Sequence, residues 1–213
     1  MVVSAIEGHR LWASTYDLGL NPLLALEERI LPTIRASRVI DVACGTGRWT
    51  TRLNAFGVDR CEEMLRAGSR KPGMRGRLLL ADASALPFAS GISDLTLCSF
   101  GVGYIQNIEA AVGEMARITR PGGQVVISDL HPAAIAAGWT RSFRTNGTVY
   151  EMEYRPTAVD EARHEAQRYG LKLMQHHDAC FGEPERHIFD AAGKSLEDFG
   201  GTPAVWLDIW TKP

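Results

Sequence analysis

Two carboxylates flank a short turn of small residues in the first third of this sequence. Asp41 lies within the apolar run 39–42, Gly45 and Gly47 follow it, and Asp59 comes 18 positions after Asp41. Glycine lets a backbone turn tightly and lets a ligand approach its peptide groups closely. A carboxylate can accept hydrogen bonds from both hydroxyls of a ribose. This combination suggests a site for an adenosine-bearing cofactor, although two glycines can equally serve a tight strand-to-helix turn alone.

The residues around this turn narrow the type of nucleotide cofactor. The dinucleotide-binding fingerprint G-x-G-x-x-G, or Ala in the third place, requires a small residue where Thr50 stands. The phosphate-loop string G-x-x-x-x-G-K-[ST] does not occur. Asp41 would repel a pyrophosphate, whereas it would attract a cofactor that carries an ammonium and a sulfonium. The sequence therefore favours a sulfonium cofactor, and an NAD(P)-dependent oxidoreductase is the alternative.

Composition and charge disfavour several other classes of function. The 213 residues carry a formal net charge of −2, whereas chains that bind nucleic acid usually have a basic excess. No apolar run of about 18 residues or more occurs, so no membrane span is expected. The four cysteines are scattered, without a CxxC pair, and residues 1–10 do not resemble a signal peptide. We therefore expect one cytoplasmic domain over residues 1–213, with reduced cysteines.

The elements that must position the two acids alternate along the chain. Apolar runs and turn signals predict strands and helices in alternation from residue 38 onward, which indicates a parallel, doubly wound sheet. In such a sheet, ligands bind at the carboxyl ends of the strands, where residues 43–47 would lie. The predicted strands are 39–43, 56–59, 77–81, 93–100, 124–128, 171–180 and 204–210, and the predicted helices are 45–53, 62–69, 108–118 and 158–169.

Residues 1–36 are predicted to form a largely helical cover. Asn21 and Pro22 are a typical helix cap and first-turn proline for a helix over 23–31. Leucine and isoleucine at positions 23, 26 and 30 would share its buried face. Glu27 and Glu28 would then lie towards water.

Five segments, in order, resemble the motifs of class I S-adenosylmethionine-dependent methyltransferases, in the small-molecule, type 11-like branch. The resemblance is close over residues 38–132. It implies a Rossmann-like, doubly wound, mostly parallel seven-stranded α/β sheet with an antiparallel last strand and helices on both faces. It also implies in-line transfer of a methyl group to O, N or C of a small molecule. The segments are VIDVACGTG (39–47), GVDRCEEML (57–65), ADASALPF (81–88), ISDLTLCSF (92–100) and EMARITRPGGQVVISDLHP (114–132).

The resemblance assigns one group of residues to the methionine part of S-adenosylmethionine. Gly45 and the carbonyl of Ala43 would border the amino-acid tail, with Asp41 near its ammonium. Tyr16, in the segment WASTYD, would reach the carboxylate end, and Ser99 would lie near the sulfonium.

A second group is assigned to the nucleoside by the same resemblance. Asp59 would hold the ribose hydroxyls, and Cys61 and Met64 would lie along the ribose or adenine. Asp82 would accept a hydrogen bond from the adenine amino group, and Ala83 would offer its backbone N–H. The sequence departs from the family between Gly47 and Asp59, where fewer residues than usual predict either a short first helix or the absence of the loop after it.

Two side chains are candidates for contact with the acceptor. Methyl transfer gains much from alignment alone, and a general base adds to the rate when the acceptor carries a proton. His131 follows the strand 124–128, at the carboxyl edge of the sheet, and imidazole titrates near neutral pH. Its alternative role is to cap a turn or pack against Pro132. Tyr104 stands where many relatives carry a histidine, and its alternative is a pocket wall with a local hydrogen bond.

Residues 133–156 are predicted to form a flap that determines specificity. Aromatic residues and arginines are mixed there, and residues 148–154 alternate with the period of a strand. Arg141 and Arg144 could together bind a carboxylate of the substrate, and the alternative for Arg144 is a solvated guanidinium.

The remaining expectations concern metals and partners. His176, His177 and Asp178 are not predicted to bind a metal ion, because adjacent side chains on a strand point to opposite faces. We expect a small-molecule substrate and no nucleic acid or membrane partner, with the protein acting as a monomer or homodimer. A non-catalytic, methyltransferase-like partner protein is a further alternative.

Overall fold

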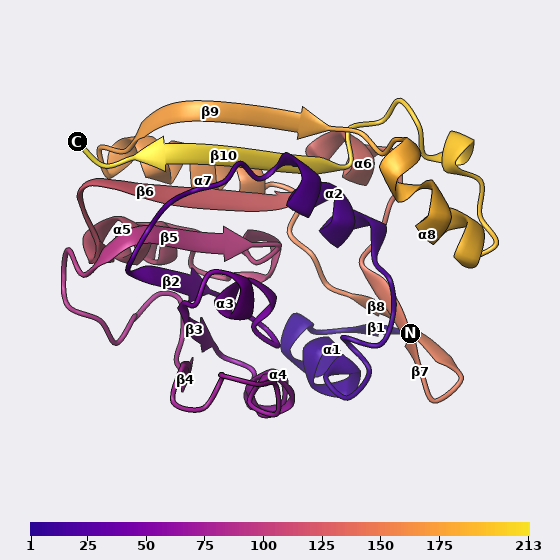
Figure 1. Cartoon of the computed structure of the whole chain (residues 1–213). Helices are drawn as coiled ribbons and strands as arrows, with labels where there is room; N and C mark the ends of the chain where they lie inside the picture. Colours follow the sequence, from indigo (N-terminus) through magenta and orange to yellow (C-terminus); the bar gives the residue numbers. More distant parts are fainter.

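The computed structural model describes residues 1–213 and contains a seven-stranded sheet with helices on both faces (Figure 1). Its strand order is β4-β3-β2-β5-β6-β10-β9, and only β10 runs against its neighbours. This is the predicted doubly wound sheet with a reversed last strand. The strands are β2 (Val39–Val42), β3 (Phe56–Asp59), β4 (Leu78–Leu80), β5 (Ser93–Ser99), β6 (Thr119–Leu130), β9 (Lys172–Ala179) and β10 (Val205–Thr211).

The central strands are buried on both faces because helical layers cover each side. On one face, Trp206 and Trp210 of β10 pack with the apolar faces of the helices α5 (Ile108–Ile118) and α7 (Ala158–Arg168). On the other face, Leu207 and Ile209 pack with Trp49 and with residues that follow the helix α2. Successive side chains of β10 therefore point into two different apolar layers, and neither face of this strand is open to water.

The helices on the second face are short. The helix α2 (Pro22–Ile30) begins as predicted, with the Asn21 side chain accepting a hydrogen bond from the Leu23 amide at 3.0 Å. The helix α3 spans only Arg48–Arg52, which confirms the short first helix. The helix α4 (Glu62–Gly68) follows β3, and the remaining helical elements are α6 (Pro132–Ala136), α8 (Arg186–Ala191), η1 (Val102–Tyr104), η2 (Glu183–Glu185) and η3 (Leu196–Asp198).

A second, smaller sheet joins the N-terminus to the predicted flap. It has the order β1-β8-β7, with β1 (Val2–Val3) parallel to β8 (Thr148–Met152) and β7 (Ser142–Thr145) antiparallel to β8. Asn146 and Gly147 join the hairpin with positive φ angles, as a tight two-residue turn requires. This sheet and the helix α1 (Ala5–Trp12) lie beyond the carboxyl ends of β5 and β6 (Figure 1).

One local expectation outside the site was wrong. Residues 121–123 were expected to precede the fifth strand, but β6 already begins at Thr119, and its pairing with β5 jumps from Thr119 to Gln124. Gly122, at φ 72°, makes the turn inside this irregular strand. Thr157 precedes α7 without capping a backbone N–H, because its hydroxyl donates to Glu161 instead. None of the helices has the length and apolar character that crossing a bilayer requires.

Candidate active site

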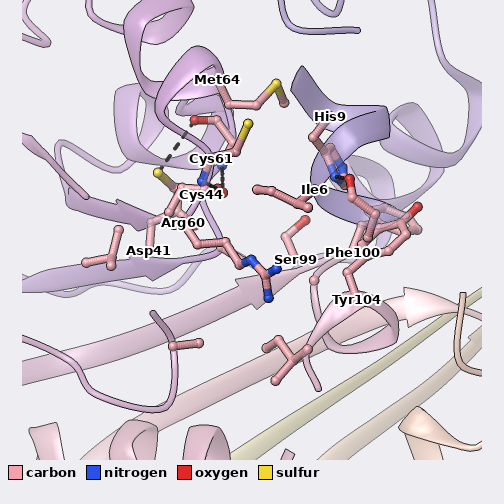
Figure 2. Close-up of a pocket in the computed structure, with 18 of the residues that line it drawn as sticks. Ile6, His9, Asp41, Cys44, Arg60, Cys61, Met64, Ser99, Phe100 and Tyr104 are labelled. Atoms are coloured by element: carbon pink, nitrogen blue, oxygen red, sulfur yellow. Dashed lines mark hydrogen bonds between the residues drawn. The ribbon is translucent and has the colours of Figure 1, made fainter. Parts of the chain in front are cut away.

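A cavity opens at the carboxyl ends of β2, β3 and β5. The chain crosses from β2 to β3 on one side and returns to β5 on the other, so this is the switch point of the sheet, where ligands of doubly wound folds bind. Figure 2 shows Ile6 and His9 of α1 facing Cys61 and Met64 across this space. Helix α1 therefore closes the cavity from the side opposite the glycine turn.

The turn after β2 is held in a left-handed backbone conformation. Ala43, Gly45 and Gly47 have φ angles of 54°, 56° and 79°. Such angles are strained for a residue with a side chain, which makes Ala43 an outlier at the end of a central strand. A Cβ at Gly47 would lie 2.5 Å from the Met74 methyl carbon. The turn therefore requires glycine through its backbone angles, and a side chain at position 47 would also displace the Met74 methyl group.

Asp59 connects this turn to the beginning of α4. Its Oδ2 accepts a hydrogen bond from the Gly45 amide at 2.7 Å, and its Oδ1 accepts one from the Cys61 amide at 2.8 Å. The carboxylate also lines the cavity. Since each carboxylate oxygen can accept a second hydrogen bond, Asp59 is fixed in position and can still accept from a diol.

Asp41 lies beneath the turn and is only 2% exposed. Thr50 donates its hydroxyl to Asp41 Oδ2 at 2.6 Å. Burial raises the pKa of Asp41 to about 7, and this hydrogen bond lowers it only in part. Thr50 stands where a dinucleotide fold requires a small residue, and here its hydroxyl serves to hold the acid.

Glu27 is buried, contrary to the expectation that it lies towards water. It is 1% exposed and receives hydrogen bonds from Trp49 Nε1 at 3.0 Å, from the hydroxyls of Ser99 and Ser128, and from the Arg48 guanidinium. These donors come from α3 and from the ends of β5 and β6. Helix α2 packs over those strand ends, so the face that carries Glu27 points inward.

This network gives a testable stability prediction. Glu27→Gln is expected to lower the free energy of unfolding by about 1–3 kcal/mol, because Arg48 loses its closest charged acceptor in a buried site. The change corresponds to a melting temperature lower by roughly 2–4 °C per kcal/mol for a chain of this size. Glu28→Gln is the matched control, since Glu28 is partly exposed and its ion pairs with Arg48 and Arg52 contribute at most about 1 kcal/mol. Equal melting temperatures for the two variants would contradict the role of Glu27.

The opposite end of the cavity is more open. Asp82 is exposed at its rim, and hydrogen bonds from the Ser84 amide and hydroxyl, at 2.9 and 2.7 Å, lower the pKa of this carboxyl. Ala83 lines the cavity beside it, and the buried side chains of Cys61 and Met64 form its floor.

Three polar side chains are in contact where α1 and the residue before β7 line the cavity. Arg141 Nε donates to the Tyr104 hydroxyl at 2.9 Å, and the His9 ring packs edge-on against the Tyr104 ring at 4.9 Å. His9 Nδ1 lies 2.8 Å from the carbonyl oxygen of Ala5. Because a carbonyl only accepts, Nδ1 carries the proton and Nε2 keeps its lone pair. Burial lowers the pKa of His9 and raises that of Tyr104, so both side chains are neutral near pH 7.

Comparison with known proteins identifies the family. The family model described as a methyltransferase domain matches residues 40–127. Malonyl-[acyl-carrier protein] O-methyltransferase of Pectobacterium atrosepticum is 27% identical over 84% of this chain and 68% of its own length. Demethylmenaquinone methyltransferase of Renibacterium salmoninarum is 33% identical over 61% of this chain and 54% of its own length. These matches identify residues 40–127 as a methyltransferase domain and support a class I S-adenosylmethionine-dependent methyltransferase.

Solved structures agree on the fold of this methyltransferase. An S-adenosylmethionine-dependent methyltransferase from Mesorhizobium loti superposes with a TM-score of 0.66 at 17% identity, over 98% of this chain and all of the other. The chain spans about half the length of the demethylmenaquinone methyltransferase it matches. S-adenosylmethionine is the cofactor of the family, and these matches favour it over NAD(P).

Ten positions are predicted to border the cofactor, and all ten lie along this one cavity. Tyr104 lines it too, and its hydroxyl accepts a hydrogen bond from Arg141, which is the geometry of a pocket wall with a local hydrogen bond. Its contact with the acceptor stays a prediction. The ten positions are Tyr16, Asp41, Ala43, Gly45, Asp59, Cys61, Met64, Asp82, Ala83 and Ser99.

His131 is not among the lining residues, and it takes the alternative role of a cap. Its Nδ1 accepts from the Ala133 amide at 2.9 Å and thereby caps α6, while Nε2 lies 2.9 Å from Asp178 Oδ1. Pro132 starts α6 directly after this residue, so the imidazole is held at the helix end. His176, in turn, contacts Asp178 and Asp208.

Sequence reasoning missed His9, Arg48 and Glu27. No motif marks His9, which lies on an eight-residue helix within the N-terminal cover. Arg48 directly follows the glycine turn, and its basic side chain at the start of a helix was a signal that could have been used. The packing of α1 brings His9 to the cavity, and the packing of α2 buries Glu27 against Arg48, which itself lines the cavity.

Proposed function

We propose that this protein transfers a methyl group from S-adenosylmethionine to O, N or C of a small-molecule acceptor in the cytoplasm. The cofactor supplies a methyl group on a positively charged sulfur. The observation that carries the proposal is the convergence of Asp41, Asp59 and the turn 43–47 on one cavity. A buried acid that can face an ammonium, a fixed carboxylate that can accept from a diol, and a turn without bulky side chains fit this cofactor.

The names of the relatives support an acceptor that is not a nucleic acid. One relative is named for O-methylation of malonyl-[acyl-carrier protein] and the other for demethylmenaquinone. The four free cysteines of this chain, three of them buried, support a reducing compartment.

His9 is the residue we propose as general base for an acceptor that carries a proton. Its Nε2 lone pair is available, and the hydrogen bond between Nδ1 and the Ala5 carbonyl fixes the tautomer. The lowered pKa keeps the imidazole neutral near pH 7, as a proton acceptor requires. Tyr104 packs against this ring and limits its rotation.

Calorimetry and turnover together test the function. We expect S-adenosylhomocysteine to bind the purified protein and NADH not to bind. Incubation with S-adenosylmethionine labelled in the methyl group, against a panel of phenols, amines and carboxylic acids, is expected to yield a labelled product. Binding of NADH alone would favour the oxidoreductase, and cofactor binding without turnover on any acceptor would favour a non-catalytic role.

The affinity for S-adenosylhomocysteine is expected to fall in acid because of Asp41. Its pKa is about 7 in the free protein, so below this pH binding of the cationic ammonium must first ionise the acid. The expected loss approaches tenfold per pH unit well below this pKa, and it amounts to roughly 15-fold between pH 7 and 5.5. Asp41→Asn is expected to bind more weakly at pH 7, with a flatter pH profile. An unchanged slope in that variant would show that another group titrates.

The stability of the free protein should change in the opposite direction with pH. The folded-state pKa of Asp41 lies above its unfolded value of 3.8, so the native state binds more protons between these values. This residue therefore lowers the free energy of unfolding as pH rises from about 4 to 7.

A further inference from the structure

Arg141 is a buried cation on the acceptor side of the cavity. It is only 9% exposed, and its guanidinium carbon lies 5.1 Å from the centre of the Phe100 ring and 5.8 Å from that of Tyr104. Its Nε donates to the Tyr104 hydroxyl. The residue directly precedes β7, the first strand of the flap hairpin, and its side chain lines the cavity.

The charge of Arg141 has no direct counterpart in the protein. No carboxylate lies within ion-pair distance, and the buried Nη1 has no hydrogen-bond partner. Asp129 is the acid whose charge acts on it, but its oxygens already accept from the amides of Gly103 and Leu130. Burying a cation without a partner is costly, so this arrangement is typical of a site that a ligand completes.

Two other arginines line the cavity, and both differ in this respect. Arg60 is exposed, so water solvates its charge. Arg48 forms ion pairs with Glu27 and Glu28, so its charge is balanced within the protein. It lies next to the turn 43–47, where the amino-acid tail of the cofactor is proposed to bind. Arg141 lies over Phe100, past the end of β5, and is therefore available to a second ligand.

The hairpin itself separates Arg141 from Arg144. Along residues 141–145, burial alternates: Arg141, Phe143 and Thr145 are buried, while Ser142 and Arg144 are exposed. Arg144 makes one hydrogen bond, from Nη1 to the Gly147 carbonyl at 3.3 Å. Only the first of the two arginines in the predicted flap thus faces the cavity, and the second provides a matched control.

We propose that Arg141 binds a carboxylate of the methyl acceptor, so that the substrates of this enzyme are compounds that carry a carboxylic acid. The proposal rests on the proposed function, since it assigns the second ligand of the same cavity. A guanidinium forms paired, charge-assisted hydrogen bonds with a carboxylate, and the unpartnered Nη1 would be satisfied by one of them. The other possible source of such a carboxylate is the tail of the cofactor, and the experiment separates the two.

The test uses the full chain saturated with S-adenosylhomocysteine. Benzoate and hexanoate are titrated against benzamide and hexanamide by calorimetry. We expect the carboxylates to bind and the amides not to bind. Arg141→Met is expected to weaken carboxylate binding by about 10- to 100-fold, because a hydrogen-bonded charge pair is lost. Arg144→Met is expected to bind both acids as the wild type does. Carboxylates that bind no better than amides, or that bind Arg141→Met equally well, would overturn the proposal.

Two further measurements identify the source of the carboxylate and the role of the residue. S-adenosylhomocysteine is expected to bind Arg141→Met with unchanged affinity, and a loss in this titration would assign the carboxylate to the cofactor. Absence of binding to the wild-type protein would instead reject the proposed function. The ligand-free melting temperature of Arg141→Met should equal or exceed that of the wild type, since an unpaired buried charge is removed. If Arg141 had a purely structural role, Arg141→Met would have a lower melting temperature and would still bind carboxylates. Arg141→Lys should bind carboxylates with an affinity between those of the wild type and Arg141→Met.

Discussion

Asp59→Ala is expected to weaken S-adenosylhomocysteine binding by about 100- to 10,000-fold, because two charge-assisted hydrogen bonds to a ribose diol are lost. The same carboxylate accepts from the amides of Gly45 and Cys61 in the free protein. Its loss therefore also loosens the turn that borders the amino-acid tail. Isothermal calorimetry below the melting temperature of the variant measures the change directly.

Two substitutions serve as controls for this prediction. Asp59→Asn keeps one carbonyl oxygen, so we expect an affinity between those of the wild type and Asp59→Ala. Asp82→Asn changes an acid at the exposed rim, where water competes for the same hydrogen bonds, and a smaller loss is expected. Affinity that is unchanged in Asp59→Ala would remove Asp59 from the nucleoside site.

His9→Asn is expected to lower kcat by about 100- to 10,000-fold for an acceptor that must lose a proton. The asparagine side chain is close in size to imidazole but accepts protons very weakly, so the general base is lost while the cavity is retained. Binding of S-adenosylhomocysteine should change little. Steady-state kinetics with an acceptor found in the turnover panel provides the measurement.

A second histidine variant separates base catalysis from a general effect of histidine removal. In His131→Asn the new side chain can still cap α6, and the residue lies outside the cavity, so kcat should stay at the wild-type level. In the wild type, kcat/KM should rise with pH through a pKa below 6.5, since burial lowers the pKa of His9. A loss of activity in His131→Asn with none in His9→Asn would return the role of base to His131.

The sequence by itself determined the sheet and the cofactor side of the cavity. Strands such as 39–42 and 56–59 are short apolar runs with a turn after each, and parallel strands present their carboxyl ends at one edge. Residues at the carboxyl ends of such strands, including Asp59 and Ser99, therefore come together whatever the details of packing. This is why the positions chosen from motifs at the strand ends line the same cavity.

Only the tertiary structure decided the acceptor side and the charge balance around the turn. Glu27 lies in a stretch whose pattern predicts a face in water, but α2 packs over strand ends that present several donors to it. His131 follows β6 as expected, yet the helix that Pro132 begins holds its ring as a cap. His9 and Arg141 reach the cavity because β1 pairs with the flap hairpin and brings α1 against it. Such placements depend on contacts between segments far apart in the chain, and local periodicity carries no information about them.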